Sequence, residues 1–471
     1  MSRDRAMIVR HGMWSLAGKV TNLAVAFLNT ALVARLLTPV EFADLNALRT
    51  LMMLLAIGLA GGLAQMSLRR LGQLSPAERA STLPHRIVRN AFCLFAAASL
   101  LVVGIAVMLL WKGAGWFVHG QLPPFQIAIA SAGILLIGAS ELIAEFHRGL
   151  GVPGTANFLG GTRGAPATTL LFVVLLSAAS FVAPVDFLTA NTLFVVATLL
   201  ICGVGYRSLY RKLAQRDDNV VWEREWPRPA FSGHRFAEAL PLSLALMMSF
   251  AVLQGDLLLA ARLPTAEESA AYVGARRCIQ LISIPLMVLN TLASGIITPL
   301  ITSNRRELLE KTLRGCCGVA AVPALAMAVC FAAAPELSLR IILGEGYSPG
   351  STALRILVIG QVLYVLTGSC GTVLTLTGCR RTVLVTNLVA LLTLASGGPF
   401  VASRFGAVGL ATLVSGILAA NNLMNWYLAR RLTGINTWFS FRDMLQLRGL
   451  LSSAGNQSPR VPDARTSHAA R

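Results

Sequence analysis

The sequence predicts an all-α, polytopic membrane protein, and three observations lead to that prediction. Of the 471 residues, 55% are hydrophobic and 13% are charged, whereas soluble domains have about 25% charged residues. The mean hydropathy is +0.67. Apolar runs of roughly 20 residues recur from end to end, each long enough to cross a hydrocarbon core about 30 Å thick. Since these runs lack the period-two alternation of membrane β-strands, we expect helices.

We expect about 12 transmembrane helices in two six-helix lobes related by tandem duplication. The predicted spans are residues 13–34, 45–66, 88–111, 125–146, 158–182, 187–206, 237–260, 271–302, 313–334, 352–377, 382–401 and 405–428. The first run is too long and too polar for a cleavable signal peptide, so it should anchor the protein.

Four regions follow from this pattern. They are an N-terminal six-helix lobe, a basic cytoplasmic linker, a C-terminal six-helix lobe and a cytoplasmic tail, at residues 1–206, 207–236, 237–430 and 431–471. The tail begins with an amphipathic piece, residues 437–451, suited to the inner membrane interface. We expect the polar remainder of the tail to be largely disordered, because it lacks apolar periodicity.

A repeated motif indicates the duplication. Six of the ten residues from 34 to 43 recur when the sequence is shifted by 227 residues. The matches include residue types that are scarce in apolar sequence, namely Arg35 and Arg262, Thr38 and Thr265, and Glu41 and Glu268. The same shift matches three further pairs, which are Arg49 and Arg276, Gly151 and Gly378, and Thr155 and Thr382. Self-similarity at a fixed shift is typical of a repeated structural unit.

The formal net charge of +19 comes from Lys and Arg that lie mostly in short segments between the apolar runs. With the N-terminus in the cytoplasm, the predicted cytoplasmic segments contain most of them, as the positive-inside rule requires. We therefore expect a multi-pass membrane protein with both termini in the cytoplasm. Basic loops beside a membrane attract anionic lipid head groups, and we expect no nucleic-acid partner.

The eight cysteines are scattered through or beside the apolar runs, without CxxC spacing or neighbouring histidines. Packing thiols are the simplest interpretation, and neither a metal site nor a disulfide framework is expected. The sequence has no Walker motif, zinc-ligand spacing or nucleophile elbow. We expect no cofactor and no enzymatic activity. With no nucleotide site, any pumping would have to draw on a proton or sodium gradient or on the substrate's own gradient.

The first predicted span has a polar stripe formed by Ser15, Lys19, Asn22 and Asn29. Their spacing places all four on one face of a helix. The functional interpretation is that this face lines a substrate cavity. The alternative is a seam between helices held by interhelical hydrogen bonds.

Arg49 and Arg276 are the sharpest candidate pair, because each lies about two turns inside its span at corresponding positions of the repeat. Two permanent cations facing each other across a pseudo-two-fold axis would bind a phosphate or pyrophosphate. The alternative is that each pairs locally, for example Arg276 with Asp256, or extends to the outer head groups. Arg277, on a different side of the helix, is expected to extend to the head groups.

Carboxylates inside spans are candidates for coupling or gating, because ionisable groups are costly there. Asp256 falls on Asn29 under the repeat shift. Glu141, Glu145 and Arg148 lie at i, i+4 and i+7 and form one edge of the fourth span. They could form an inner gate or bind a coupling proton or cation. The alternative is an ordinary intrahelical pair at the interface.

Four stretches resemble the polysaccharide (O-antigen) flippase family of the multidrug/oligosaccharidyl-lipid/polysaccharide (MOP) exporter superfamily. They are HGMWSLAGKVTNLAVAFLNTALVARLLTPVEFADLNALRTL, then RIILGEGYSPGSTALRILVIGQVLYVL followed by TLTGCRRTVL, and FGAVGLATLVSGILA. The resemblance covers nearly the whole chain to about residue 430, although TPVEFADL departs from the family's usual TPxxFGxY. It implies two lobes around a cavity that opens alternately to each side. It also implies a cationic cavity for a diphosphate, for which Arg49, Arg276 and Lys19 are candidates.

The resemblance implies a flippase that moves an undecaprenyl-diphosphate-linked oligosaccharide to the outer leaflet for exopolysaccharide, capsule or O-antigen (lipopolysaccharide) assembly, with polysaccharide assembly proteins as partners. The second hypothesis is a cation-coupled multidrug antiporter of the same superfamily, which would want carboxylates deep in the spans. A third is a membrane polysaccharide polymerase or ligase. That class needs catalytic residues on a large outer loop, and the predicted outer loops are short. A purely structural role is the fourth.

Overall fold

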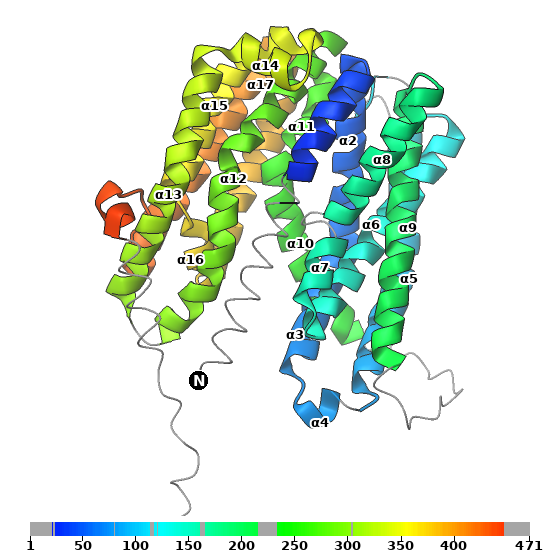
Figure 1. The fold of residues 1–471 in the computed structure, drawn as a ribbon, viewed down its shortest axis with the longest axis vertical. Coiled ribbons are helices and arrows are strands. Elements are labelled where there is room, and N and C mark those ends of the chain that lie inside the picture. Colours follow the sequence, from blue (N-terminus) through cyan, green and yellow to red (C-terminus); the bar gives the residue numbers. More distant parts are fainter. Residues whose placement is uncertain are drawn as a thin grey trace, which may run out of the picture. The chain divides into compact units, whose positions relative to one another are not determined.

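A computed structural model describes residue 21 and residues 24–79, 81–113, 117–119, 121–160, 165–214, 233–302 and 305–446. Lys19, Asn22, most of the linker and the tail beyond residue 446 lie outside these residues. The described chain consists of helices joined by turns (Figure 1), which confirms the all-α prediction. It divides into two compact units. The larger comprises Met1–Gln280, Val329–Gly360 and Asn387–Ile417, and the smaller Leu281–Ala328, Gln361–Thr386 and Leu418–Arg471.

The larger unit contains most of the helices. Its first part is formed by the helix Ala24–Leu36, α2 (Pro39–Ala56), the π-helical turn η1 (Ile57–Gly61), α3 (Gly62–Gln73), α4 (Pro76–Arg79), α5 (Leu83–Lys112), α6 (Pro124–Gly149), α7 (Pro153–Leu159), α8 (Pro166–Val182) and α9 (Phe187–Ala214). Its later part includes α10 (Gly233–Gln254), α11 (Asp256–Leu259), η3 (Ala260–Arg262), α14 (Pro335–Ile342) and η4 (Glu345–Gly350).

Four helices run through the boundary between the units, and α16 (Cys370–Leu376) lies in the smaller one. The four are α12 (Ala266–Thr302), α13 (Arg306–Ala333), α15 (Ser351–Thr367) and α17 (Arg380–Thr433). α17 consists of two helices joined at a kink, where Gly406 has φ 61°. The kink is at the second residue of the last predicted span, 405–428.

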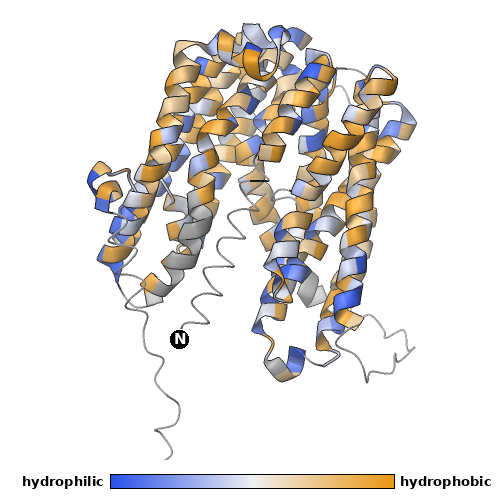
Figure 2. Cartoon of the chain, viewed as in Figure 1, coloured by the Kyte–Doolittle hydropathy of each residue, from blue (hydrophilic) through white to orange (hydrophobic). Residues whose placement is uncertain are grey.

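The helices have the length and composition of membrane spans. Among the described residues, seven helices are long and apolar enough to cross a bilayer, or eight if the bent pair Glu238–Gln254 and Asp256–Arg262 is one broken span. Apolar residues extend along most of their length in Figure 2. Large apolar side chains also face outward, such as Leu100 at 80% and Phe181 at 89% exposure. A water-soluble surface rarely has so much exposed apolar area, so the chain is a multi-pass membrane protein.

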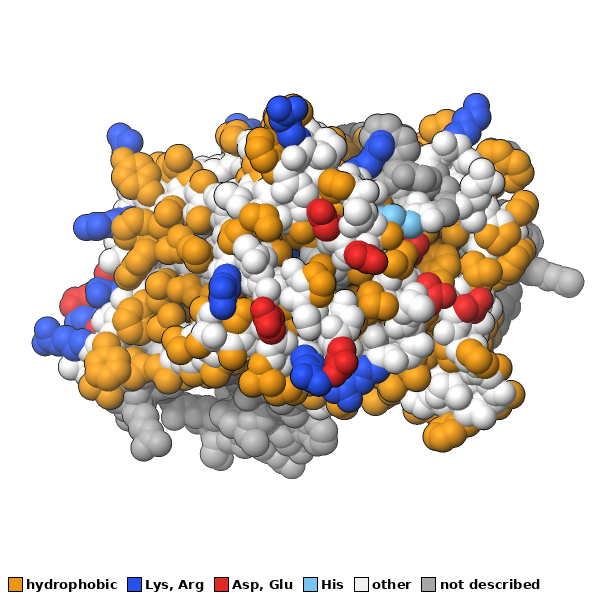
Figure 3. All heavy atoms as spheres, turned by 90° about the horizontal axis from the view of Figure 1, so that it is seen from above, with side chains coloured by type: hydrophobic (Ala, Val, Ile, Leu, Met, Phe, Trp, Pro, Cys, Tyr) orange, Lys and Arg blue, Asp and Glu red, His pale blue; other side chains and the backbone are white. Residues whose placement is uncertain are grey.

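Charged side chains on one end face are interspersed. On the face shown in Figure 3, the described Lys and Arg side chains lie singly or in small groups among apolar and acidic ones. A nucleic-acid-binding surface would need a continuous basic stripe. This face therefore has no such stripe among the side chains that Figure 3 colours.

The repeated Thr-x-x-Glu motif begins a helix in both copies. Thr38 is the N-cap of α2, and its hydroxyl accepts from the Glu41 amide while the Glu41 carboxylate accepts from the Thr38 amide, which is a complete capping box. At the start of α12, the Glu268 amide donates to the Thr265 hydroxyl at 3.1 Å. Caps of this kind satisfy amides that have no partner within the helix.

Both glutamates of the motif also reach a later helix. Glu41 accepts from the amide of Phe187 at the start of α9, at 3.3 Å. Glu268 accepts from the amide of Ala407, just after the kink in α17, at 3.1 Å. The repeated carboxylates thus make equivalent bonds, and the sequence match between them has a structural reason.

The matched glycines are equivalent as well. Gly151 precedes α7 with φ 84°, and Gly378 precedes α17 with φ 90°. A positive φ is strained for residues with a Cβ atom. Each copy therefore requires glycine at this turn.

The beginning of α2 packs against η4 within the larger unit. The Tyr347 hydroxyl donates to the Ala34 carbonyl at 3.2 Å, and the ring lies edge-on to Phe42 with centroids 5.5 Å apart. Arg35 Nη2 donates to the Ile341 carbonyl at 2.6 Å. The repeated segment 34–43 is therefore joined directly to a segment from the second half of the chain.

The π turn η1 lies where α3 approaches α10. A Cβ atom on Gly62 would lie 2.1 Å from the carbonyl oxygen of Ala239. The Gly62 amide donates to the hydroxyl of Ser243 at 2.9 Å. Only glycine permits backbones to pass at this distance.

The chain after α17 packs against other parts of the smaller unit, to which it belongs. Thr437 is fully buried, and its hydroxyl donates to the Thr367 carbonyl at 2.7 Å. Asp443 Oδ2 lies 3.2 Å from Arg314 Nε. The first part of the predicted tail is thus held to α13 and the end of α15.

Candidate functional site

The candidate site begins at a break in a membrane helix. α10 ends at Gln254, and the chain bends by 58° before continuing as α11 from Asp256. Gly255 forms the bend, where a Cβ atom would lie 2.4 Å from the Ala251 carbonyl oxygen. The last carbonyls of a helix have no partner within it, so the break leaves acceptors inside the larger unit.

Arg276 of α12 pairs with Asp256 at this break. Its Nε donates to Asp256 Oδ2 at 2.6 Å, and its Nη2 donates to the Leu253 carbonyl at 2.5 Å. The Tyr272 hydroxyl donates to the same Oδ2 at 2.7 Å. The side chains of Asp256 and Arg276 are 1% and 6% exposed. Burial costs each charge its hydration, and the pair neutralises both.

Arg277, the next residue, connects α12 to α2. Its Nε donates to Asn46 Oδ1 at 2.8 Å, and its Nη1 donates to Gln280 Oε1 at 3.2 Å. Gln280 Nε2 in turn donates to Gln254 Oε1 at 3.2 Å, next to the helix break. The expectation that Arg277 extends to the head groups is wrong, because its guanidinium is held by amide oxygens from α2 and from its own helix.

Arg49 of α2 lies between two aromatic rings. Its guanidinium carbon is 4.4 Å from the ring centre of Phe172 on α8 and 4.2 Å from that of Phe194 on α9. Within the described part of the chain, its enclosed Nε and Nη2 have no hydrogen-bond acceptor. Cation–π contacts stabilise the charge by about 0.5–2 kcal/mol, but they leave these N–H donors available. Arg49 is therefore a permanent cation with unsatisfied donors, held by rings on both sides.

The structure brings some predicted site residues together and separates others. Asp256 lies against Arg276. Arg49 and Arg276 each turn toward different helices, and no bond joins them among the described residues. Asn29, on the helix Ala24–Leu36, has an enclosed Oδ1 without a donor among those residues. Lys19 and Asn22 are outside the described chain.

The second predicted group lies on α6. Glu141 and Glu145 are both buried. Arg148 pairs with Glu145 and donates from Nη2 to Asn157 Oδ1 of α7 at 3.2 Å. The intrahelical pair that was one of the two interpretations is present, and it also ties α6 to α7.

Sequence reasoning missed Asn46, Tyr272 and the two phenylalanines around Arg49. Two of these had a usable signal. Asn46 lies three residues before Arg49, and Tyr272 lies four before Arg276, so each shares a helix face with its arginine. The phenylalanines had none, because their contact depends on how three helices pack.

Comparison with known proteins gives the fold a context. No protein-family model and no curated protein matches the sequence. Among solved structures, the lipid II flippase MurJ in an inward closed conformation matches with TM-score 0.66 and 11% identity, over 94% of this chain and 92% of that one. An inward-facing MATE-family multidrug resistance transporter matches with TM-score 0.64 and 14% identity, over 95% and 100%.

A third solved structure, a MOP superfamily transporter from Pyrococcus furiosus, matches with TM-score 0.57 and 16% identity, over 96% of each chain. The chain has the MOP transporter fold. At these identities the likeness establishes the fold and leaves the substrate open. The fold that the resemblance implies is therefore confirmed.

Proposed function

We propose that this protein flips a polyprenyl-diphosphate-linked oligosaccharide across the bacterial inner membrane by alternating access, as the polysaccharide flippase family does. The single observation that supports it most is the state of Arg49. A half-buried arginine whose Nε and Nη2 are enclosed and unsatisfied suits an anionic ligand, because arginine binds phosphate groups through paired N–H donors. The diphosphate is the anionic part of such a substrate.

The charges around Arg49 favour the same substrate class. Arg49, Arg276 and Arg277 are three permanent cations of the larger unit, and Asp256 is the carboxylate bonded to this group. The charge of Arg276 neutralises that of Asp256, so the cations of Arg49 and Arg277 remain in excess. We assign the diphosphate to these two, with Lys19, Asn22 and Asn29 as further candidates for the cavity wall.

The second candidate, a cation-coupled multidrug antiporter, is supported by the MATE-family neighbours. A cation site would need a carboxylate that is free to bind the ion. Asp256 is bonded instead by Arg276 and Tyr272, which favours the anionic substrate. Glu141 and Glu145, with Arg148 beside them, are the remaining carboxylates that we propose for proton or sodium coupling or for gating.

We also propose the finer architecture, which is 12 spans in two lobes related by duplication, with both termini in the cytoplasm. The equivalent bonds of Glu41 and Glu268 and the equivalent turns at Gly151 and Gly378 support it. The contact between the repeated segment and Tyr347 supports a closed passage at the end we assign to the outside. Assembly proteins that receive the oligosaccharide there would be the partners.

The test is a leaflet-resolved measurement of the lipid-linked oligosaccharide in a strain lacking this protein. We expect the intermediate to accumulate on the cytoplasmic face, and the wild-type gene to restore surface polymer. Arg49→Gln should fail to restore it at unchanged protein level. Arg355→Gln is the matched control, because Arg355 is exposed and donates only to the Ala332 carbonyl among the described residues.

Two outcomes would overturn the proposal. Normal polymer with altered resistance to cationic dyes would move the function to the antiporter. Full restoration by Arg49→Gln would show that this cation does not bind the diphosphate.

A further inference from the structure

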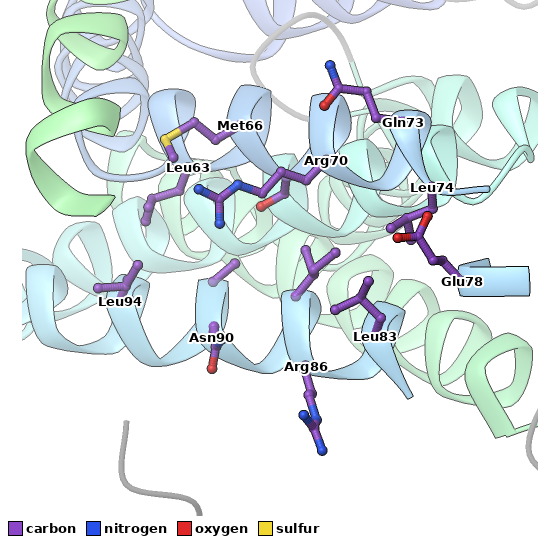
Figure 4. Close-up of a pocket in the computed structure, with 13 residues that line it drawn as sticks. Leu63, Met66, Arg70, Gln73, Leu74, Glu78, Leu83, Arg86, Asn90 and Leu94 are labelled. Carbon is purple, nitrogen blue, oxygen red and sulfur yellow. The ribbon is translucent and has the colours of Figure 1, made fainter. Parts of the chain in front are cut away.

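A cavity of about 530 Å³ opens between α3 and α5, away from the arginines of the candidate site. Its apolar wall includes Leu63, Met66, Ile87 and Leu94, and its polar residues include Arg70, Gln73, Arg86 and Asn90. Figure 4 shows that Arg70 extends into the groove from α3. Arg86 leaves α5 on the side away from α3 and lies at the rim. An apolar groove with a polar, cationic edge is amphipathic, as a lipid is.

The groove borders the most lipid-facing span of the described chain. Only 17% of the most apolar stretch of Leu83–Lys112 is buried, the lowest share of any candidate span. One flank of the groove is therefore α5, a helix that the protein leaves largely uncovered. An occupant could enter from the bilayer without crossing a protein wall.

The two arginines at the groove, Arg70 and Arg86, form only weak ion pairs or none among the described residues. Arg70 Nη2 lies 3.6 Å from Glu238 Oε2, with the side chains 41% and 46% exposed. Exposed pairs of this length contribute little, so Arg70 is free to exchange partners. Arg86 is exposed, and no ion pair is recorded for it among the described residues.

One carboxylate, Glu78, also lines the groove. Its carboxylate caps the start of α4, where the amide and hydroxyl of Ser75 each donate to Oε2 at 2.8 Å. These bonds hold the pKa of Glu78 below its usual value. The lining therefore has two cations and one carboxylate, and that carboxylate already has its own donors.

We propose that the α3–α5 groove binds an anionic phospholipid, with its phosphate beside Arg70, the charge of Arg86 at the rim, and an acyl chain against the apolar wall. Basic pockets between transmembrane helices are known to hold anionic head groups. Charge selects the head group, and the exposed face of α5 admits the chain. The site is separate from the transported substrate and would stand if that substrate proved different.

The test titrates the purified full-length protein with phosphatidylglycerol or phosphatidylcholine in mixed micelles and counts retained lipids by native mass spectrometry. The double variant Arg70→Gln/Arg86→Gln should weaken phosphatidylglycerol binding by about tenfold, since the charge-assisted bond of Arg70 and the rim charge of Arg86 are lost. Its control is Arg69→Gln/Arg89→Gln, which removes the same charge from neighbouring exposed positions outside the groove. The control should stay within about twofold of wild type.

Three results would overturn the proposal. Equal weakening by both double variants would mean diffuse attraction to a basic rim. Equal binding of the two lipids by the wild type would exclude charge selection. Saturation by soluble glycerol phosphate at the same concentration would identify a phosphate site without a lipid. If the pocket double variant does not fold, Arg86→Gln alone, at an exposed position, is compared with Arg89→Gln.

Discussion

Replacing Arg276 by alanine should destabilise the protein strongly, because it leaves a buried carboxylate without its counter-ion. Asp256 is 1% exposed, and its Oδ2 is bonded by Arg276 at 2.6 Å and by Tyr272 at 2.7 Å. Its Oδ1 has no donor within the described chain. After Arg276→Ala, one hydroxyl would remain to stabilise a charge that water cannot reach, and the Leu253 carbonyl would lose its donor as well.

The magnitude follows from that count. Breaking a buried pair by removing one partner costs about 3–5 kcal/mol. Each 1.4 kcal/mol is a factor of about ten, so the unfolding equilibrium should shift by roughly a hundredfold to a few thousandfold. The lower end applies if the carboxylate becomes protonated, since a neutral acid is cheaper to bury.

A matched variant separates the lost charge from the lost contacts. Asp256→Leu/Tyr272→Phe/Arg276→Met removes the whole buried group together, and replacing a buried pair by apolar residues of similar volume is often neutral or stabilising. The assay is the unfolding midpoint of the purified protein in one detergent, followed by fluorescence-detected size exclusion after heating. The reasoning is refuted if Arg276→Ala matches the wild type, or if the triple variant is as unstable as the single one.

Two further predictions use the same assay. Gly62→Ala should lower the midpoint, since a Cβ atom would lie 2.1 Å from the Ala239 carbonyl oxygen and overpacking costs about 1–3 kcal/mol. Gly72→Ala meets nothing within 4 Å, so it should raise the midpoint through a gain in stability of up to about 1 kcal/mol. Equal shifts of the two midpoints would contradict the close approach at Gly62. Removing residues 447–471 should leave the midpoint unchanged. Removing residues 437–471 should lower it, because the buried Thr437 and the pair of Asp443 with Arg314 are lost. An unchanged midpoint in the shorter chain would show that residues 437–446 do not contribute to stability.

Much of the fold follows from the sequence because apolar run length and charge placement act locally. The predicted spans from residue 45 onward overlap described helices, whereas much of the first span lies outside the described residues. The kink at Gly406 lies at the start of the last predicted span. The repeat was visible for a physical reason. Capping residues such as Thr38 and Glu41, and glycines at positive φ, are restricted to few residue types and so stay recognisable.

The candidate site could be predicted less completely from the sequence, because the polar face of a helix does not indicate which other helix it packs against. Arg276 was predicted as either a ligand-binding cation or a partner of Asp256, and the structure has the pair. The position of Arg49 was found, but not Phe172 and Phe194 around it. Those contacts join α2 to α8 and α9, which come much later in the sequence. The apolar helices contain many phenylalanines, and the sequence does not indicate which of them contact Arg49.

The π turn Ile57–Gly61 has a consequence for the direction in which its helix docks. A π turn accommodates one more residue than an α turn, and one residue corresponds to about 100° of rotation around a helix. The extra residue of the π turn therefore determines which side of α3 faces a given direction relative to α2, while it barely changes the length of the span. Shortening the chain by one residue here would straighten the helix, but it would rotate Gly62 away from α10 and present a bulkier neighbour to the same backbone.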